Sequence, residues 1–440
     1  MNISSQLPNR LLSQIDAFFV AYQERSGILM QLGGEAELRG DIHVVHVMEM
    51  LQQLVSRWPQ LGQKLSCRLF GLKWSGETRL EEMLYTTNSI DSLTDWRNQP
   101  INPFEAPPFQ LLWVSEQDRH ILAFRAHHAV IDGEAFFDVC IEALSILAKL
   151  CGGHSIPLQS KIPQISMLKL LNPMQLLRSG KIQSMISYIR RMGAEANADR
   201  SIRLRIRECK PGDTAIWEQR LNNTCLKQFK INAQAHNINP LWLFAAAWAR
   251  AIHIWNNDES EPSNSFISFE IPVSLRRKYR SYETIGNYIS PLTLFGEATL
   301  PIIDLARILR RQFVKEIRNR SFLAMPLFSA LGRFLPWALF RRVSVSTTST
   351  GFATTHFTWL EQKRDIYSEI EKYSNGRLEM LNQIIYTPVC LQMGVALMVI
   401  TMSDHLHLFI TYRLTALHAE DVNQLASILI SELKQIGIEM

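Results

Sequence analysis

The sequence is poor in cysteine, and its six cysteines are scattered without any Cys-x-x-Cys pair. Several of them lie inside apolar runs, where an isolated cysteine packs as a small hydrophobic residue. This pattern argues against a secreted domain held together by disulfides. We therefore expect reduced thiols and a cytoplasmic protein.

Long apolar runs are also missing. The first twenty residues are interrupted by Arg10 and Asp16, so they lack the continuous apolar stretch of a signal peptide. The most apolar segment, Pro240 to Trp255, contains Arg250 and His253 and is shorter than the ~20 apolar residues that span a bilayer. We expect no membrane span, with peripheral contact at a membrane surface as an alternative.

The chain has no strong excess of one charge. Its formal net charge of +5 is well short of that of a dedicated nucleic-acid-binding protein. A mildly basic surface suits an anionic small molecule or a membrane at least as well. The hydrophobic share of 47% supplies a large core, and a length of 440 residues favours two domains.

Hydrophobic periodicity predicts helices and strands that mix in both halves of the chain. The predicted elements are a helix at 41–58, a hairpin at 109–127, helices at 134–150, 224–236 and 240–255, a strand at 266–273, a hairpin at 395–414 and a helix at 419–436. The fold class is therefore α/β or α+β, in two lobes. We place the lobes at residues 1–170 and 216–440, joined by a basic connecting segment at 171–215.

The stretch FRAHHAVIDGEAFF, residues 124–137, places polar residues between an apolar strand and an apolar helix. Consecutive strand residues point to opposite faces, so only one of His127 and His128 faces a given cleft. A neutral histidine accepts a proton from a hydroxyl or an amine near neutral pH. Asp132 is placed to fix the loop through a charge pair, and Gly133 lets another group approach closely.

Other interpretations of this stretch are weaker. A metal site is disfavoured because adjacent strand histidines diverge and no third ligand is evident. A serine hydrolase of the Gly-x-Ser-x-Gly type is excluded because that motif is absent. A structural pair of histidines followed by a turn is the remaining alternative, and the complete pattern argues against it.

The motif HHAVIDG resembles the HHxxxDG motif of the superfamily that contains chloramphenicol acetyltransferase, peptide-synthetase condensation domains, polyketide-associated acyltransferases and bacterial wax ester synthases. Three looser similarities extend the resemblance over most of the chain. They are LLSQIDAFFVAY near the start, QLVSRWPQLGQKL after it, and IPVSLRRKYRSYETIGNYISPL in the second half.

The resemblance implies two similar α/β lobes arranged in a V, with a tunnel between them. It implies that His128 is the general base, that His127 is mainly structural, and that Asp132 pairs with an arginine of the second lobe. Arg276 is the candidate for that arginine, with Arg277 as the second choice. Gly133 matches the glycine that leaves room for the thioester arm of the donor.

Further positions follow from the resemblance less directly. Asn287, in GNYIS, is a candidate for positioning substrate or supporting the oxyanion, with a simple β-turn as the alternative. Thr347, Thr348, Ser349 and Thr355 lie where relatives have a crossing loop and a strand rich in serine and asparagine, a pattern that is absent here. His356 is expected to be structural.

The implied function is acyl transfer from a thioester to a hydroxyl or an amine, without an acyl-enzyme. Acyl-coenzyme A is the preferred donor, no cofactor is permanently bound, and no metal is expected. The first alternative is a free-standing condensation enzyme with an acyl carrier protein as donor and partner. The second is a catalytically silent binding module.

Two local features bear on the choice of branch. Asn239-Pro240 replaces the Asn-Asp pair of wax ester synthases, and the Asp-Phe-Gly-Trp-Gly segment of plant relatives is absent. The apolar segment Ser321 to Val343 is consistent with membrane contact or a lipid-sized acyl pocket. An ordinary pair of core helices split by prolines is the alternative for that segment.

Overall fold

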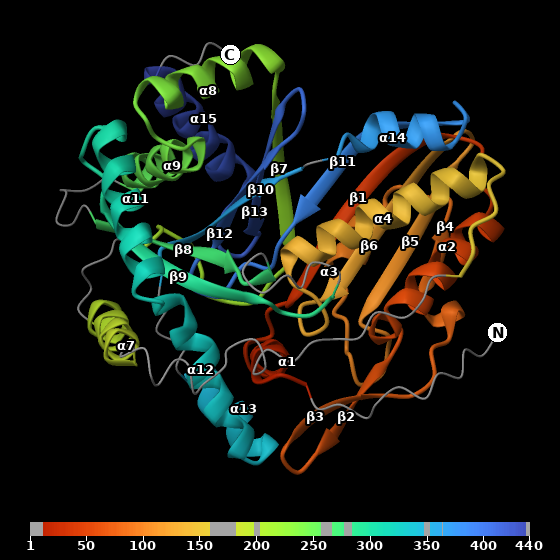
Figure 1. Cartoon of the computed structure of the whole chain (residues 1–440), viewed down its shortest axis with the longest axis horizontal. Helices are drawn as coiled ribbons and strands as arrows, with labels where there is room; N and C mark the ends of the chain where they lie inside the picture. Colours follow the sequence, from red (N-terminus) through yellow and green to blue (C-terminus); the bar gives the residue numbers. More distant parts are fainter. Residues whose placement is uncertain are drawn as a thin grey trace.

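A computed structural model describes residues 12–158, 182–197, 203–256, 266–276, 284–346, 353–362 and 364–436. Two sheets lie beside each other, and each carries its own layer of helices (Figure 1). The predicted mixture of helices and strands in two lobes is confirmed.

The first lobe is built on a five-stranded sheet with one parallel pair, β4 with β5. In order across the sheet its strands are β11 (Leu378–Tyr386), β1 (Gln31–Gly40), β6 (Arg119–His127), β5 (Phe109–Glu116) and β4 (Leu84–Thr87). Three helices cover one face of it: α2 (Val44–Arg57), α4 (Gly133–Cys151) and α14 (Ile366–Tyr373). Smaller elements complete the lobe: α1 (Gln14–Ser26), the β2–β3 hairpin (Lys64–Arg68, Gly71–Ser75) and α3 (Ser92–Asn98).

The second lobe is built on a six-stranded mixed sheet. Its strands, in order, are β7 (Thr214–Leu221), β13 (Leu406–Arg413), β12 (Val395–Thr401), β10 (Thr355–Glu361), β8 (Phe266–Ser274) and β9 (Ile289–Glu297). Its main helices are α8 (Asn223–Ala235), α9 (Pro240–Asn256), α11 (Ile302–Arg318) and α15 (Ala419–Gln435). Further helices are α7 (Ile182–Asn197), α12 (Ala324–Leu331) and α13 (Trp337–Ser346).

The two faces of the second sheet have different neighbours because strand side chains alternate. Leu397 and Val399 of β12 pack with the helices of their own lobe. Met398 and Ile400, on the opposite face, join the apolar cluster of the first lobe. One face of this sheet is therefore turned toward the first lobe.

One segment crosses between the lobes. Strand β11 comes from the second half of the chain, yet it pairs antiparallel with β1 at the edge of the first sheet, with Gly33 opposite Tyr386. Helix α14, which precedes β11, packs on α4. The second lobe was predicted at residues 216–440 from sequence order alone. Periodicity within a strand does not show which sheet the strand joins, so it gave no sign that β11 pairs with β1.

Most predicted elements are present, with differences at their ends. The helix predicted from Thr224 begins at Asn223, and Asn222 caps it by accepting a hydrogen bond from the backbone N of Cys225 at 3.0 Å. The helix predicted from Asp41 begins at Val44. Asn222 and Thr224 offer similar side-chain oxygens, so the sequence does not separate them, whereas the N-cap of α2 is His43, a residue type that cap preferences do not favour.

The apolar segment Ser321 to Val343 forms a pair of helices, α12 and α13, which pack against α1. Trp337 and Phe340 are buried on the α1 side, as expected of core helices. Phe334 and Leu339 are exposed on the other side. Burial of one side supports the core interpretation, and contact with a membrane stays a prediction.

We predict that Gly33→Ala destabilises the first lobe by about 1–3 kcal/mol, the usual cost of overpacking. A Cβ at Gly33 would lie 1.8 Å from Cζ of Tyr386, so the aromatic ring would have to leave its place across β1. Gly34→Ala is the matched control, since its Cβ would meet Phe136 at an ordinary 3.5 Å. Urea unfolding of both variants measures the difference, and equal losses would refute the close packing of Tyr386 on β1.

Candidate active site

The HHxxxDG motif spans the end of a strand, a loop and the start of a helix, as predicted. His127 is the last residue of β6, and Asp132 is the N-cap of α4. Oδ1 of Asp132 accepts a hydrogen bond from the backbone N of Ala135 at 2.9 Å. The cap fixes the direction in which the loop enters the helix.

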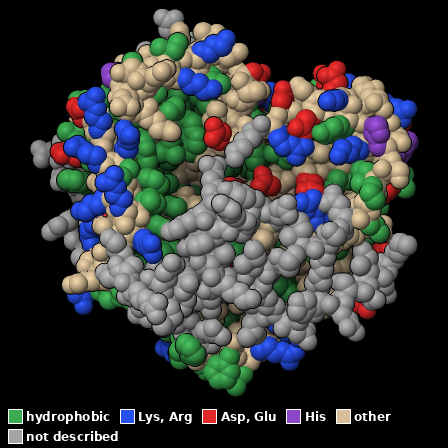
Figure 2. Space-filling view, viewed as in Figure 1, with side chains coloured by type: hydrophobic (Ala, Val, Ile, Leu, Met, Phe, Trp, Pro, Cys, Tyr) green, Lys and Arg blue, Asp and Glu red, His purple; other side chains and the backbone are tan. Residues whose placement is uncertain are grey.

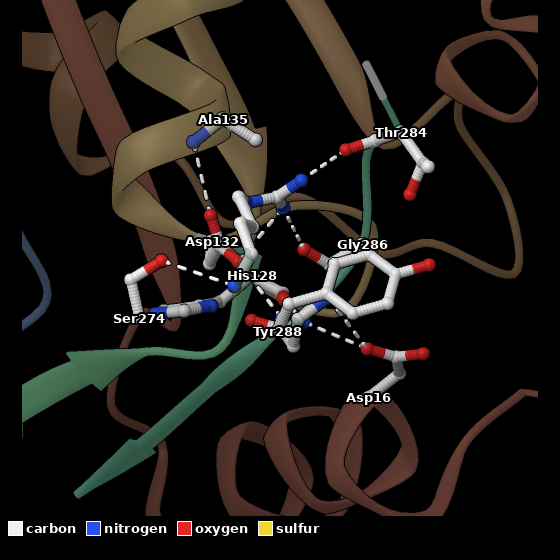
Figure 3. A network of polar contacts seen from close by, with 10 residues as sticks. Asp16, His128, Asp132, Ala135, Ser274, Thr284, Gly286 and Tyr288 are labelled. Atoms are coloured by element: carbon white, nitrogen blue, oxygen red, sulfur yellow. Dashed lines mark hydrogen bonds and ion pairs between the residues drawn. The ribbon is translucent and has the colours of Figure 1, made fainter. Parts of the chain in front are cut away.

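The second carboxylate oxygen of Asp132 reaches the other lobe. Oδ2 accepts hydrogen bonds from Nη2 of Arg276 and from the backbone N of Tyr288, each at 2.8 Å (Figure 3). Both Asp132 and Arg276 are almost completely buried. The arginine expected to pair with Asp132 therefore does so, and the ion pair joins the motif loop to the second lobe.

The guanidinium of Arg276 is also fixed by its own lobe. It donates hydrogen bonds to the carbonyl oxygens of Thr284 and Gly286, and it lies over the ring of Tyr288 at 4.7 Å from the centroid. These contacts satisfy most of the donors of a buried cation, which is the condition for a buried ion pair to be tolerated. Arg277, the second choice, lies outside the described residues.

Asn287 supports the backbone of the motif loop. Its Nδ2 donates to the carbonyl oxygen of His128 at 2.5 Å and to Oδ1 of Asp16 at 2.8 Å. Both amide hydrogens are therefore used by protein acceptors, which disfavours the predicted support of an oxyanion. Its Oδ1 is also buried, so the predicted contact of Asn287 with substrate stays a prediction.

Asp16, on α1, is a site residue for which no role was predicted. Its carboxylate accepts hydrogen bonds from Asn287 and caps α1 together with Ser13, and burial raises its pKa to about 6. The Ser-x-x-Asp spacing is a capping-box signal, so the helix start was readable. The contact with Asn287 joins positions 271 residues apart and leaves no local pattern.

Both the backbone and the imidazole ring of His128 are held by neighbouring residues. Its backbone N donates to the carbonyl oxygen of Met30 at 2.7 Å. Its ring stacks on Phe19 of α1, with centroids 3.9 Å apart and planes at 8°. The residue keeps 7% of its surface exposed, whereas His127 keeps 0%.

The two histidines have different electrostatic surroundings. Burial lowers the pKa of His127 to about 3, and its Nδ1 accepts a hydrogen bond from the backbone N of Ala129 at 3.0 Å. Burial also lowers the pKa of His128, against the opposing charge of Asp132. His128 is therefore neutral at pH 7 and able to accept a proton, while His127 is fixed within the fold.

Two of the remaining predicted positions lie in described elements, Gly133 at the start of α4 and Thr355 at the start of β10. A Cβ at Gly133 would meet nothing within 4 Å, so there is open space beside the first turn of α4. Oγ1 of Thr355 accepts from Nε1 of Trp248 on the helix side of the second sheet, away from the first lobe. Thr347, Thr348 and Ser349 lie outside the described residues.

A separate basic groove lies on α11. It has a volume of about 790 Å³ and is lined by Arg307, Arg310, Arg311, Lys315 and Arg318, together with His236. Lys and Arg side chains follow this edge of the second lobe (Figure 2). Because α11 covers the helix side of the sheet, the groove is distinct from the His128 site.

Comparison with known proteins identifies the fold. No family model matches the chain, and no curated protein matches its sequence. Among solved structures, the first condensation domain of the CDA synthetase superimposes with a TM-score of 0.70 at 12% identity, over 99% of this chain and 97% of that one. This chain has the condensation-domain fold.

Two further structures share this fold. Polyketide synthase associated protein 5 from Mycobacterium tuberculosis has a TM-score of 0.67 at 14% identity, over 97% of this chain and 99% of that one. The X-domain of teicoplanin biosynthesis, in its complex with OxyB, has a TM-score of 0.64 at 12% identity, over 99% of this chain and 94% of that one.

In the part of the chain that the structure describes, no helix is long and apolar enough to cross a membrane.

We predict that Arg276→Leu lowers the free energy of unfolding by about 3–5 kcal/mol, since it leaves Asp132 as an unpaired buried carboxylate. Arg39→Leu is the control: its ion pair with Glu379 has side chains 54% and 60% exposed. Such an exposed pair contributes at most about 1 kcal/mol. Denaturant unfolding compares the variants, and a loss for Arg276→Leu no larger than the control's would argue against a stabilising pair between the lobes.

Proposed function

We propose that this protein is an acyltransferase that moves an acyl group from a thioester to a hydroxyl or an amine. The observation that carries the proposal is the imidazole of His128, which is neutral, fixed by its neighbours and almost buried beside the second lobe, with 7% of the residue's surface exposed. The condensation-domain fold supports the proposal independently.

In the proposed reaction the acceptor oxygen or nitrogen attacks the thioester carbonyl while His128 takes its proton. The tetrahedral intermediate then collapses, the C–S bond breaks, and the imidazolium returns the proton to the leaving thiolate. Transfer is direct, so no residue of the protein becomes acylated. Base catalysis contributes about 10²–10⁴-fold to such a step, and fixing both substrates together contributes more.

The other residues of the motif act through His128. Asp132 and Arg276 hold the loop against the second lobe, and Asn287 binds the carbonyl oxygen of His128. His127 fills the core beneath the loop. The open space beside Gly133 fits the approach of the donor arm, and a tunnel between the lobes is the route that the proposal requires.

The donor distinguishes the main proposal from its alternative. We propose acyl-coenzyme A as the donor, as the sequence resemblance implies. The alternative is a free-standing condensation enzyme with a carrier-bound donor. It is favoured by structural neighbours named as the condensation domain of a polyketide synthase and the first condensation domain of the CDA synthetase. The neighbour solved with OxyB favours a third function, a binding module without chemistry.

We predict that His128→Ala lowers thioester-dependent transfer by at least about 10²-fold, since the variant has no base at the reacting atoms. Purified protein is incubated with acyl-coenzyme A or acyl-carrier donors and small alcohols or amines, and free thiol is measured over time. His43→Ala is the control, because His43 is an exposed residue before α2.

Thermal melting of both variants separates loss of chemistry from loss of fold. Wild-type turnover by a folded His128→Ala protein would contradict the proposal. Absence of thiol release from the wild type with every donor would favour the binding module.

The lowered pKa of His128 predicts the direction of the pH profile. A base works in its neutral form, and burial keeps His128 neutral below the ordinary value of 6.5. With an alcohol acceptor, kcat/KM should therefore stay constant as pH falls from 8 to about 6.5 and decline only at lower pH. A decline centred above pH 7 would show that another group controls the rate.

A further inference from the structure

A second pair of titratable side chains lies on the sheet of the second lobe. Glu270 of β8 and His356 of β10 are direct neighbours in the parallel register of the two strands. Nδ1 of His356 lies 3.8 Å from Oε1 of Glu270, and Nε2 of His356 is 2.8 Å from the hydroxyl of Thr358. No role was predicted for Glu270, and His356 was expected to be structural.

Strand alternation places this pair on the face that is turned toward the first lobe. Phe269 and Phe357, the neighbours in sequence, belong to the core on the helix side. Leu360, on the same face of β10 as His356, packs against the apolar cluster of the first lobe. The pair therefore faces the lobe that carries His128.

The pair is also electrostatically close to His128. Burial, together with the smaller repulsion from a protonated His128, lowers the pKa of His356 to about 4. Burial raises the pKa of Glu270 to about 7. Yet the side chains of His356 and Glu270 remain 23% and 29% accessible, which fits groups that line a space between the lobes rather than a sealed core.

Glu270 has no cationic partner among the residues that the structure describes. Its one ion-pair neighbour there is His356, which is neutral at pH 7 because its pKa is so low. A carboxylate in such surroundings gains free energy from any cation that reaches it. An accessible carboxylate without a counter-ion, facing the base of a proposed transferase, is suited to bind a cationic group of a substrate.

We propose that Glu270, beside His356, binds the ammonium group of an amine acceptor and takes its first proton. An alkylammonium has no lone pair, so it must lose one proton before it attacks a thioester. Glu270 accepts that proton and later releases it to solvent. The neutral amine then attacks, His128 takes the second proton, and the leaving thiolate receives it as the C–S bond breaks.

This inference rests on the proposed function and narrows its acceptor to amines. An alcohol needs one base, whereas an ammonium needs two, so the two acceptors depend differently on Glu270. The product formed with the favoured acceptor is an amide. The inference gives the second lobe a chemical role of its own beyond supporting the motif loop.

The experiment compares two acceptors of equal length, hexylamine and 1-hexanol, with octanoyl-coenzyme A as donor at pH 8. For Glu270→Gln, which keeps the side-chain shape, the ratio of kcat/KM for the amine to that for the alcohol should fall at least about 10²-fold, the contribution of one general base. Glu270→Asp should recover part of the ratio. Glu361→Gln removes the same charge from the exposed end of β10 and should leave the ratio unchanged.

A binding measurement does not depend on turnover. By titration calorimetry at pH 8, the wild type should bind hexylammonium at least tenfold more tightly than 1-hexanol, and Glu270→Gln should bind both equally. An unchanged ratio and unchanged affinities in Glu270→Gln would overturn this inference while the role of His128 stands. Activity of His128→Ala would overturn the proposed function, and the affinities would still report on Glu270.

Discussion

The site depends on one buried ion pair between the lobes. Asp132 caps α4 with one oxygen and binds Arg276 and the backbone of Tyr288 with the other, so a single carboxylate fixes a helix, a loop and a neighbouring lobe. Burying both charges costs free energy, which the surrounding hydrogen bonds offset. Each charge therefore depends on the other, because removal of one leaves its partner buried without a counter-ion.

Three segments converge on His128, which lies on a fourth. Phe19 comes from α1, Met30 from the residue before β1, Asn287 from the residues before β9, and the histidine itself from the loop after β6. None of these segments holds the imidazole alone. The orientation of the ring is therefore a property of the assembled lobes, and changes distant from the motif alter it through α1 or β9.

Local sequence patterns predicted part of this arrangement. The hairpin of β5 and β6 and helix α4 follow from alternation and periodicity. Asp132 was expected to fix the loop, and its role as the N-cap of α4 was found only in the structure. The pairing of Asp132 with Arg276 was predicted only through a family resemblance. The contacts of Asp16 and the Glu270–His356 pair were not predicted, because they depend on which strands become neighbours, and periodicity within one strand carries no information about that.

The crossing of β11 has a consequence for biosynthesis. The first sheet gains its edge strand only from residues 378–386, so a nascent chain that has emerged as far as the motif loop still exposes the backbone edge of β1. The sheet that carries the histidines is therefore completed only after β11 has left the ribosome. Strand β11 therefore joins the two lobes. Its release would open the edge of the first sheet and remove a connection between the lobes.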